Sequence, residues 1–435
     1  MRISVVQPSE LGPAEIATWR SFQYHTAPLA NAFLSPDFAI AVGRQRPCAR
    51  VAVLHDGADI AGFFPFERRG LGWGMPIGAG LTDFQGLVHA PGAEWDTREL
   101  LKACGISVWQ FDHLVPGQKP FETGQTALAD SPVIDLSQGY DAYFQALKQS
   151  SNKFCTDIRR KTRKMEREVG ELRFVPDSQD VTDLRTLMAW KSAQYQRTGR
   201  IDRFSQPWVV DLVEDLLTHR SEHFGGELSM LYAGDVPVAS HFAVRFGARL
   251  TFWFTAYSTQ FNVYSPGLLH TLRTIESAAA QGVELIDLGK GRKRWKESLK
   301  SYDTQVAEGI VTRPCPLAAM HWVRRAPTAW AIRQVRANET LFNAFDRALK
   351  KGGAVRGSLL ARLGRPEASV QPALAAEPAA DRQPSDGMMT RPLCRPFSPE
   401  PTVGPAPGQP APRPSRTNHV TQPPRLRRVP QRADI

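Results

Sequence analysis

Apolar residues follow a regular pattern between residues 171 and 312, where helical and strand-like spacings succeed one another. Helical spacing predicts helices at 181–197, 208–219, 268–280 and 295–301. Alternating or short continuous apolar runs predict strands at 171–175, 227–233, 236–246, 249–257, 283–288 and 305–312. The resulting order is β-α-α-β-β-β-α-β-α-β, in which an antiparallel meander is followed by a helix and a returning strand.

The preceding residues, 1–140, are predicted to form an α/β unit of their own. We expect helices at 14–23 and 94–104 and strands at 51–54, 60–66 and 106–114. The first two strands flank His55-Asp-Gly-Ala-Asp59, which is typical of a hairpin turn. The composition of 70–80 and 116–132 indicates loops, and further helices are expected at 140–147 and 152–169.

Beyond residue 314 the pattern changes twice. Residues 315–358 mix apolar and basic side chains and are expected to form basic amphipathic helices. Of the 34 prolines, 16 lie in residues 360–435, together with 11 arginines, no lysine and few bulky apolar residues. Such a segment cannot bury enough surface to offset the entropy lost on ordering, so we expect a disordered tail. The predicted regions are therefore 1–140, 141–314, 315–358 and 359–435.

The formal net charge of +11 is spread unevenly over the 435 residues. Residues 360–435 carry +5 of it, so a uniformly basic nucleic-acid-binding protein is a poor description. The chain lacks an apolar run of membrane-spanning length and an apolar leader, and its five cysteines are scattered. These features favour a reduced, cytoplasmic location. His219 and His223 lack the glutamate of a zinc hydrolase, so we expect no metal.

Motifs between residues 252 and 296 carry a family resemblance. They read Phe252-Trp-Phe-Thr-Ala-Tyr257, Tyr264-Ser-Pro-Gly-Leu-Leu269, Gly282-Val-Glu-Leu-Ile-Asp-Leu-Gly-Lys-Gly291 and Arg294-Trp-Lys296. With the basic helix 157–167 they resemble GNAT-superfamily acyltransferases of the CelD/FemAB-like type, bacterial proteins associated with cellulose and exopolysaccharide biosynthesis. The resemblance implies an α/β (α+β) tandem GNAT-like fold with a mixed, mostly antiparallel sheet, a degenerate N-terminal half and an active C-terminal half.

The resemblance also implies acyl-CoA as the co-substrate. A helix that begins after Ser265 offers unpaired N–H groups and a dipole that favour phosphate, although an ordinary helix start is the alternative. The predicted donor-binding residues are Ser265, Gly267, Leu268, Leu269, Gly289 and Gly291. The sequence departs from the pattern in two ways, because the loop Q/R-x-x-G-x-G/A is absent and Trp295 stands where the family usually has tyrosine.

Four residues are candidates for catalysis. Asp287 ends an apolar strand and is suited to act as a base or substrate contact, or alternatively to cap a helix or pair with a neighbouring cation. Lys296 matches the lysine of the family's last motif and is expected to stabilise negative charge, unless it belongs to a solvated basic face. Tyr257 is a candidate general acid, and His241 is a candidate base whose alternative role is structural.

Two basic features allow more than one interpretation. On the helix 181–197, we expect Lys191 to face solvent and the neighbouring Trp190 and Tyr195 to pack in the core, and the alternative is that these three residues line the acceptor side of the site. The charged helix 152–169 is interpreted first as a solvated face and second as a contact for an anionic acceptor.

The sequence thus predicts a cytoplasmic GNAT-type acyltransferase that moves an acyl group from acyl-CoA to an amine or hydroxyl of a sugar or glycan precursor in polysaccharide biosynthesis. No nucleophile elbow is present, so direct attack on the thioester is favoured over a covalent intermediate. One alternative is a FemAB-like aminoacyl transferase that uses aminoacyl-tRNA. Another is a non-catalytic scaffold that holds a polysaccharide synthase at the inner face of a membrane through the basic residues after 314.

Overall fold

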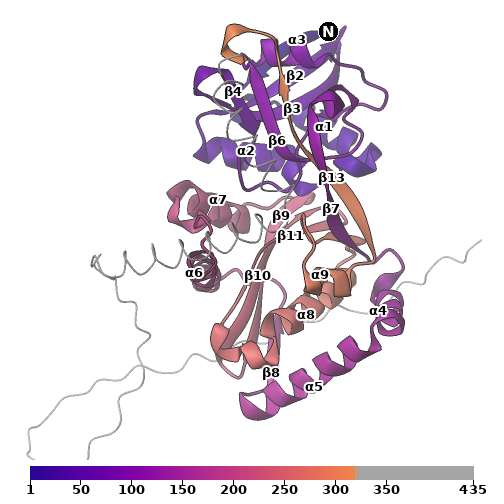
Figure 1. The fold of residues 1–435 in the computed structure, drawn as a ribbon, viewed down its shortest axis with the longest axis vertical. Helices are drawn as coiled ribbons and strands as arrows, with labels where there is room; N and C mark the ends of the chain where they lie inside the picture. The colour runs from indigo at the N-terminus through magenta and orange to yellow at the C-terminus, as the bar shows by residue number, and fades with distance from the viewer. Residues whose placement is uncertain (319–320, 322–435) are drawn as a thin grey trace, which may run out of the picture. The chain divides into compact units, whose positions relative to one another are not determined.

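A single sheet runs through the structure, which is a computed structural model that describes residues 1–318 and 321 (Figure 1). Its strand order is β1-β2-β3-β4-β6-β13-β7-β12-β11-β10-β9-β8, and β5 pairs with β3 beside this path. Most neighbours are antiparallel, while β4 with β6 and β11 with β12 are parallel. The expected mixed, mostly antiparallel sheet is therefore confirmed.

The sheet is built from two halves of the chain. The N-terminal half comprises β1 (Arg2–Val6), α1 (Pro13–His25), α2 (Pro36–Gln45), β2 (Ala49–Asp56), β3 (Asp59–Arg69), β4 (Trp73–Pro76), β5 (Val88–His89), α3 (Thr97–Ala103), β6 (Val108–Leu114) and β7 (Gln125–Asp135). The C-terminal half comprises α4 (Gly139–Ser150), α5 (Asn152–Glu168), β8 (Leu172–Val175), α6 (Val181–Arg197), α7 (Pro207–Thr218), β9 (Phe224–Ala233), β10 (Val236–Phe246), β11 (Arg249–Tyr257), α8 (Pro266–Ala280), β12 (Leu285–Asp287), α9 (Arg294–Leu299) and β13 (Tyr302–Thr312).

The predicted order of elements from residue 171 onward is confirmed. Its meander is joined by tight turns at Gly234 (φ 57°) and Gly247 (φ 55°), where a left-handed backbone favours glycine. Helix α6 spans the predicted residues, and the Asp180 side chain accepts a hydrogen bond from the Thr182 N–H (2.7 Å) at its start. Local signals were sufficient here because apolar periodicity and turn chemistry agree.

Two segments expected to be loops contain strands. Residues 125–135 form β7, and residues 73–76 form β4. The sequence of β7, Gln-Thr-Ala-Leu-Ala-Asp-Ser-Pro-Val-Ile-Asp, has few apolar residues in its first part and contains Pro132, so its composition resembles a loop. Tertiary pairing overrides this, because β7 lies between β13 and β12 and pairs with both.

Strand β13 joins the two halves. It pairs with β7 from Tyr302 opposite Val133 and with β6 from Ala307 opposite Leu114. A strand from the end of the described chain thus completes a sheet that the N-terminal half begins. The predicted regions 315–358 and 359–435 lie outside the described residues, apart from 315–318 and 321.

Helices cover both faces of β9–β11. On one face α6 and α7 bury Leu187 and Leu212 against Phe242, in a cluster that also includes Phe38 of α2. On the other face α8 buries Ile275 against side chains of β10, β11 and β12. Each large apolar side chain buried in this way contributes about 1.5–3 kcal/mol, so the shared cluster binds the halves together. None of the described helices meets the length and hydropathy needed to cross a bilayer.

The junction of β13 with β6 and β7 predicts a specific sensitivity at Gly309. A Cβ atom there would overlap the carbonyl oxygen of Gly124 and lie 2.6 Å from Phe111 Cζ. We expect Gly309→Ala to lower the free energy of unfolding by about 1–3 kcal/mol, the usual cost of overpacking. Chemical denaturation measures this. Gly70→Ala, with no atom within 4 Å of the added carbon, is the control, and equal stability of the two variants would contradict the prediction.

Candidate functional site

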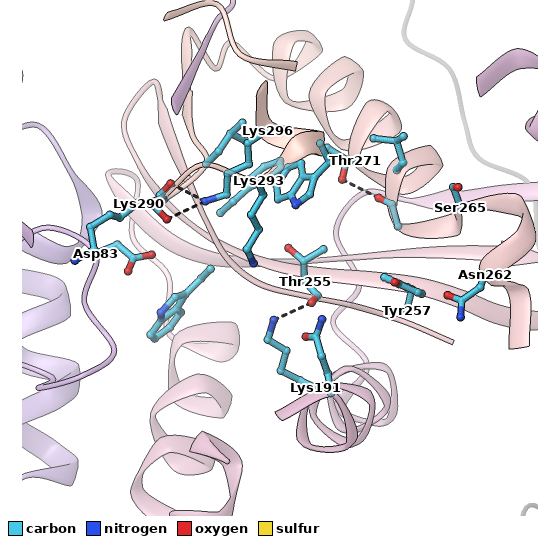
Figure 2. Close-up of a pocket in the computed structure, with 18 of the residues that line it drawn as sticks. Asp83, Lys191, Thr255, Tyr257, Asn262, Ser265, Thr271, Lys290, Lys293 and Lys296 are labelled. Carbon is cyan, nitrogen blue, oxygen red and sulfur yellow. Dashed lines mark hydrogen bonds between the residues drawn. The ribbon is translucent and has the colours of Figure 1, made fainter. Parts of the chain in front are cut away.

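Strands β11 and β12 separate after a short parallel contact. Arg249–Thr251 of β11 pair with Leu285–Asp287 of β12, and there the pairing ends. On its other side β11 stays paired with β10, with one irregularity that leaves Trp253 without an opposite residue. The separation opens a cavity of about 470 Å³ between the end of β11, the start of α8 and residues 288–296 (Figure 2).

The start of α8 forms one end of this cavity. Ser265 has a left-handed backbone (φ 56°), and Pro266, the first helical residue, has no N–H. The N–H groups of Leu268 and Leu269 both donate to the Ser265 carbonyl, at 3.0 and 3.2 Å. Within the described part of the chain, the Gly267 N–H is left without a hydrogen-bond partner. Lys161 of α5 adds a positive charge here, because its Nζ lies 3.0 Å from Ser265 Oγ.

The structure separates the predicted donor-binding residues into two groups. Ser265, Gly267, Leu268 and Gly289 line the cavity. Gly267 also lies close to Tyr257, since a Cβ atom on it would be 2.9 Å from Tyr257 Cδ1. Leu269 packs in the core, and Gly291 follows in the loop after Gly289 and is outside the lining.

Asp287 lies just behind the cavity wall. Its carboxylate accepts hydrogen bonds from the Gly289 N–H (2.7 Å) and from the Ser131 hydroxyl (3.2 Å). The alternative ion pairs do not form, because Lys290 pairs with Glu308 (3.1 Å) and Arg292 with Asp130 (2.8 Å). Burial raises the pKa of Asp287 to about 7, and the nearby Asp83 carboxylate acts in the same direction.

Lys296 reaches the cavity from α9 and is only 5% exposed. Its ammonium group donates to the carbonyl oxygens of Gly289 (2.6 Å) and Lys290 (3.2 Å). Burial, together with repulsion from Lys293, lowers its pKa to about 8. The alternative of a freely solvated lysine therefore does not describe this residue.

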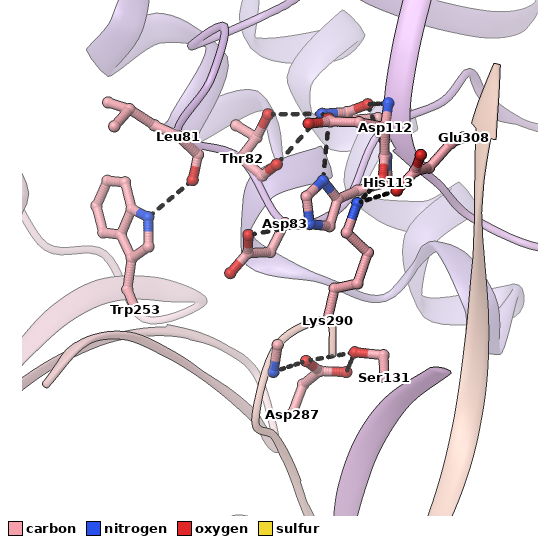
Figure 3. Close-up of polar contacts among 12 residues, drawn as sticks. Leu81, Thr82, Asp83, Asp112, His113, Ser131, Trp253, Asp287, Lys290 and Glu308 are labelled. Carbon is pink, nitrogen blue, oxygen red and sulfur yellow. Dashed lines mark hydrogen bonds and ion pairs between the residues drawn. The ribbon is translucent and has the colours of Figure 1, made fainter. Parts of the chain in front are cut away.

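Asp83 and His113 of the N-terminal half also line the cavity, and no local sequence pattern indicates either of them. His113 Nε2 lies 3.4 Å from Asp83 Oδ1, while its Nδ1 lies 3.0 Å from Asp112 Oδ1 (Figure 3). The Gln85 side-chain amide donates a hydrogen bond to Asp112 Oδ1 (2.7 Å), so Asp112, which contacts His113, is itself held in place. Burial raises the pKa of Asp83, against the opposing effect of His113 and Lys296.

The cavity contains further cations. The Lys191 ammonium group donates to the Thr255 carbonyl (3.0 Å), and burial lowers the pKa of Lys191 to about 8. The interpretation of Lys191 as a solvent-facing residue is therefore wrong, because packing of α6 against β11 directs it into the cavity (Figure 2). Trp190 packs against the core as expected. Lys293 lies in the lining as well, and burial lowers its pKa.

The two remaining catalytic candidates lie in different environments. Tyr257 lines the cavity beside Gly267. His241 is buried behind Phe252, with ring centroids 3.8 Å apart, and both of its ring nitrogens are without hydrogen-bond partners in the described structure. Burial lowers its pKa well below the usual value. The structure thus brings together Tyr257, Lys296 and the start of α8, with Asp287 immediately behind them.

Comparison with known proteins finds a family whose pattern matches part of the chain. Residues 152–297, from the start of α5 to α9, match the acetyltransferase (GNAT) domain family. The match covers 146 of the 435 residues. With the mixed sheet it confirms the expected GNAT-like fold and supports a GNAT-type transferase. A search of curated proteins finds no match.

Several solved structures resemble the chain at low sequence identity. FemX is 10% identical, with 74% of this chain and 99% of that chain covered and a TM-score of 0.49. A tandem GNAT protein from the clavulanic acid biosynthesis pathway is 10% identical over 72% and 99% of the two chains, with a TM-score of 0.45. L-PGS from Bacillus licheniformis is 11% identical over 74% and 97%, with a TM-score of 0.43.

The environment of Asp287 predicts a pH dependence of stability. An acid whose pKa is higher in the folded than in the unfolded chain binds its proton more tightly when folded, so stability falls as pH rises from about 4 to about 7. Asp287→Asn removes this titration while keeping a hydrogen-bond acceptor for Gly289. We expect a flatter stability profile over this range and a gain of about 1–3 kcal/mol at pH 8.

Urea denaturation at a series of pH values measures this difference. Asp235→Asn, at the exposed turn between β9 and β10, is the matched control and should follow the wild-type profile. Parallel profiles for wild type and Asp287→Asn would refute the assignment.

Proposed function

We propose that this protein transfers an acyl group from acyl-CoA to an amine or hydroxyl group of an acceptor. The observation that carries the proposal is the separation of β11 from β12 beside the start of α8. This separation exposes strand edges to a narrow cavity, and a thioester carbonyl that enters it would meet unpaired backbone groups and several cations. The helix start at its end offers a place for the phosphates of the donor.

The phosphate-binding site proposed here for the donor differs from a glycine-rich phosphate loop. The start of α8 supplies one free amide, that of Gly267, instead of a series of them. Lys161 compensates, because its ammonium group lies 3.0 Å from Ser265 Oγ, where it also pairs with Asp157 (2.9 Å). We therefore assign the phosphates of coenzyme A to Ser265, Gly267 and Lys161, and the acyl chain to the space beside Phe252 and Leu288.

The transfer step needs a base, and we assign this role to Asp83. The acceptor nitrogen or oxygen attacks the thioester carbonyl carbon and loses its proton to the Asp83 carboxylate, which lines the cavity and is made more basic by burial. The C–S bond breaks, and the leaving thiolate takes a proton from the Tyr257 hydroxyl. His113 positions the Asp83 carboxylate, while Lys296 stabilises negative charge that develops on the carbonyl oxygen.

A second donor class is supported by the position of α5. This helix places Lys161 beside Ser265 and exposes Lys153, Arg160 and Arg167 along the same element. A basic helix leading to the donor site suits a larger polyanion, as in transfer of an aminoacyl group from aminoacyl-tRNA. The sugar or glycan acceptor and the link to polysaccharide synthesis rest on the sequence resemblance alone.

Replacement of Asp83 tests the proposed base. We expect Asp83→Asn to lower kcat by about 10²–10⁴-fold, the usual contribution of a general base, with an unchanged Kd for acetyl-CoA. Release of free CoA thiol in the presence of a panel of amino-sugar and amine acceptors measures kcat. The variant Asp235→Asn is the control. Full activity of Asp83→Asn would eliminate Asp83 as the base.

Replacement of Lys161 tests the proposed binding site for the phosphates of the donor. We expect Lys161→Ala to raise the Kd of acetyl-CoA about tenfold, the typical value of one charge-assisted contact to phosphate. Isothermal titration calorimetry measures it, with Lys153→Ala on the exposed part of the same helix as the control. Absence of binding to acetyl-CoA and to longer acyl-CoA at millimolar concentration would overturn the donor assignment. Binding of tRNA with a strong salt dependence, in its place, would favour the aminoacyl donor.

A further inference from the structure

A second cavity of about 480 Å³ adjoins the first. It is lined by Tyr195, Arg200 and Arg203, which belong to α6 and the segment after it, and by Phe254 of β11. Asp83 and Trp253 line both cavities. The proposed base therefore stands at the boundary, where a molecule in the second cavity can present a nucleophile to a donor in the first.

The two arginines of this cavity lack carboxylate partners. Neither Arg200 nor Arg203 forms an ion pair with any described residue, unlike Arg292, which pairs with Asp130. The carboxylate closest in sequence, Asp202, instead accepts hydrogen bonds from Ser192 Oγ (3.1 Å) and the Phe204 N–H (3.0 Å).

Backbone packing fixes the position of Arg203. A Cβ atom on Gly80 would lie 3.0 Å from its Nη1, so the guanidinium lies against the backbone of the loop that leads to Asp83. Arg203 is half-buried in this position, where an unpaired charge is costly.

Positive charge is continuous from this cavity into the first one. Arg200 and Lys293 repel each other and Lys191 strongly enough to lower the pKa of both lysines, beyond the effect of burial. Asp83 is the carboxylate that lines both cavities, and it makes no ion pair with Arg200, Arg203, Lys191 or Lys293 in the described structure. A group of cations that destabilise one another in this way is stabilised by an anion from solution.

We propose that the second cavity binds the acceptor and that the acceptor carries a phosphate group, which Arg200 and Arg203 hold. This inference rests on the proposed function, because it places the acceptor's amine or hydroxyl at Asp83. The volume suits a small molecule of sugar-phosphate size. Arginine is the residue best fitted to a phosphate, because its planar guanidinium donates two parallel hydrogen bonds.

Calorimetric titration with inorganic phosphate tests the inference on the full chain, first saturated with coenzyme A so that the start of α8 is occupied. We expect the double variant Arg200→Gln, Arg203→Gln to bind phosphate at least tenfold more weakly than wild type while its affinity for coenzyme A is unchanged. Arg197→Gln, an exposed arginine at the end of α6 outside both cavities, should bind phosphate as wild type does.

The possible results separate this inference from the proposed function. No phosphate binding by wild type, equal binding by all three proteins, or a preference for malonate over phosphate would overturn the acceptor assignment. A loss of phosphate binding in Lys161→Ala but not in the arginine variant would place the anion at α8 and overturn it also. Binding of phosphate through the arginines without any binding of coenzyme A would uphold the anion site and refute the proposed donor.

Discussion

The site depends on a strand pairing that stops early. β11 continues for six residues beyond its last contact with β12, so its edge groups and the side chains of its second part face an opening instead of a neighbouring strand. An unpaired edge inside a sheet is costly unless something covers it. Here α8, the loop after Asp287 and α9 surround the opening, and a substrate carbonyl or amide can occupy the positions that a strand would take.

Charge burial around this opening shapes its chemistry. Lys296 is held by two backbone carbonyls, Asp287 by an amide and a hydroxyl, and Asp83 by His113. Removal from water favours the neutral form of each group, so it raises the pKa of Asp287 and Asp83 and lowers the pKa of Lys296. The pKa values of the acids and the base in the site are therefore closer together than in water. Proton transfer among such groups near neutral pH is easier than among solvated ones.

The N-terminal half takes part in the site, although the family motifs lie outside it. Strand β13 returns to pair with β6, and the Trp253 indole N–H donates to the Leu81 carbonyl (2.8 Å) (Figure 3). These contacts hold the segment with Asp83 over the end of β11. The halves also share a buried apolar cluster and a continuous sheet, which keep this carboxylate in place beside the C-terminal half.

The sequence by itself determined the C-terminal elements, because their apolar periodicities and glycine turns are local signals that act within about fifteen residues. It also predicted Tyr257, Ser265 and Lys296, which line the cavity, and Asp287 behind it, because these residues belong to short contiguous motifs. Only the tertiary structure decided that 125–135 is a strand, that Lys191 points inward and that Asp83 and His113 join the site. These outcomes depend on contacts between residues far apart in the sequence, 64 positions for Lys191 with Thr255 and more for β7 with β13, and no local pattern encodes a contact of that kind.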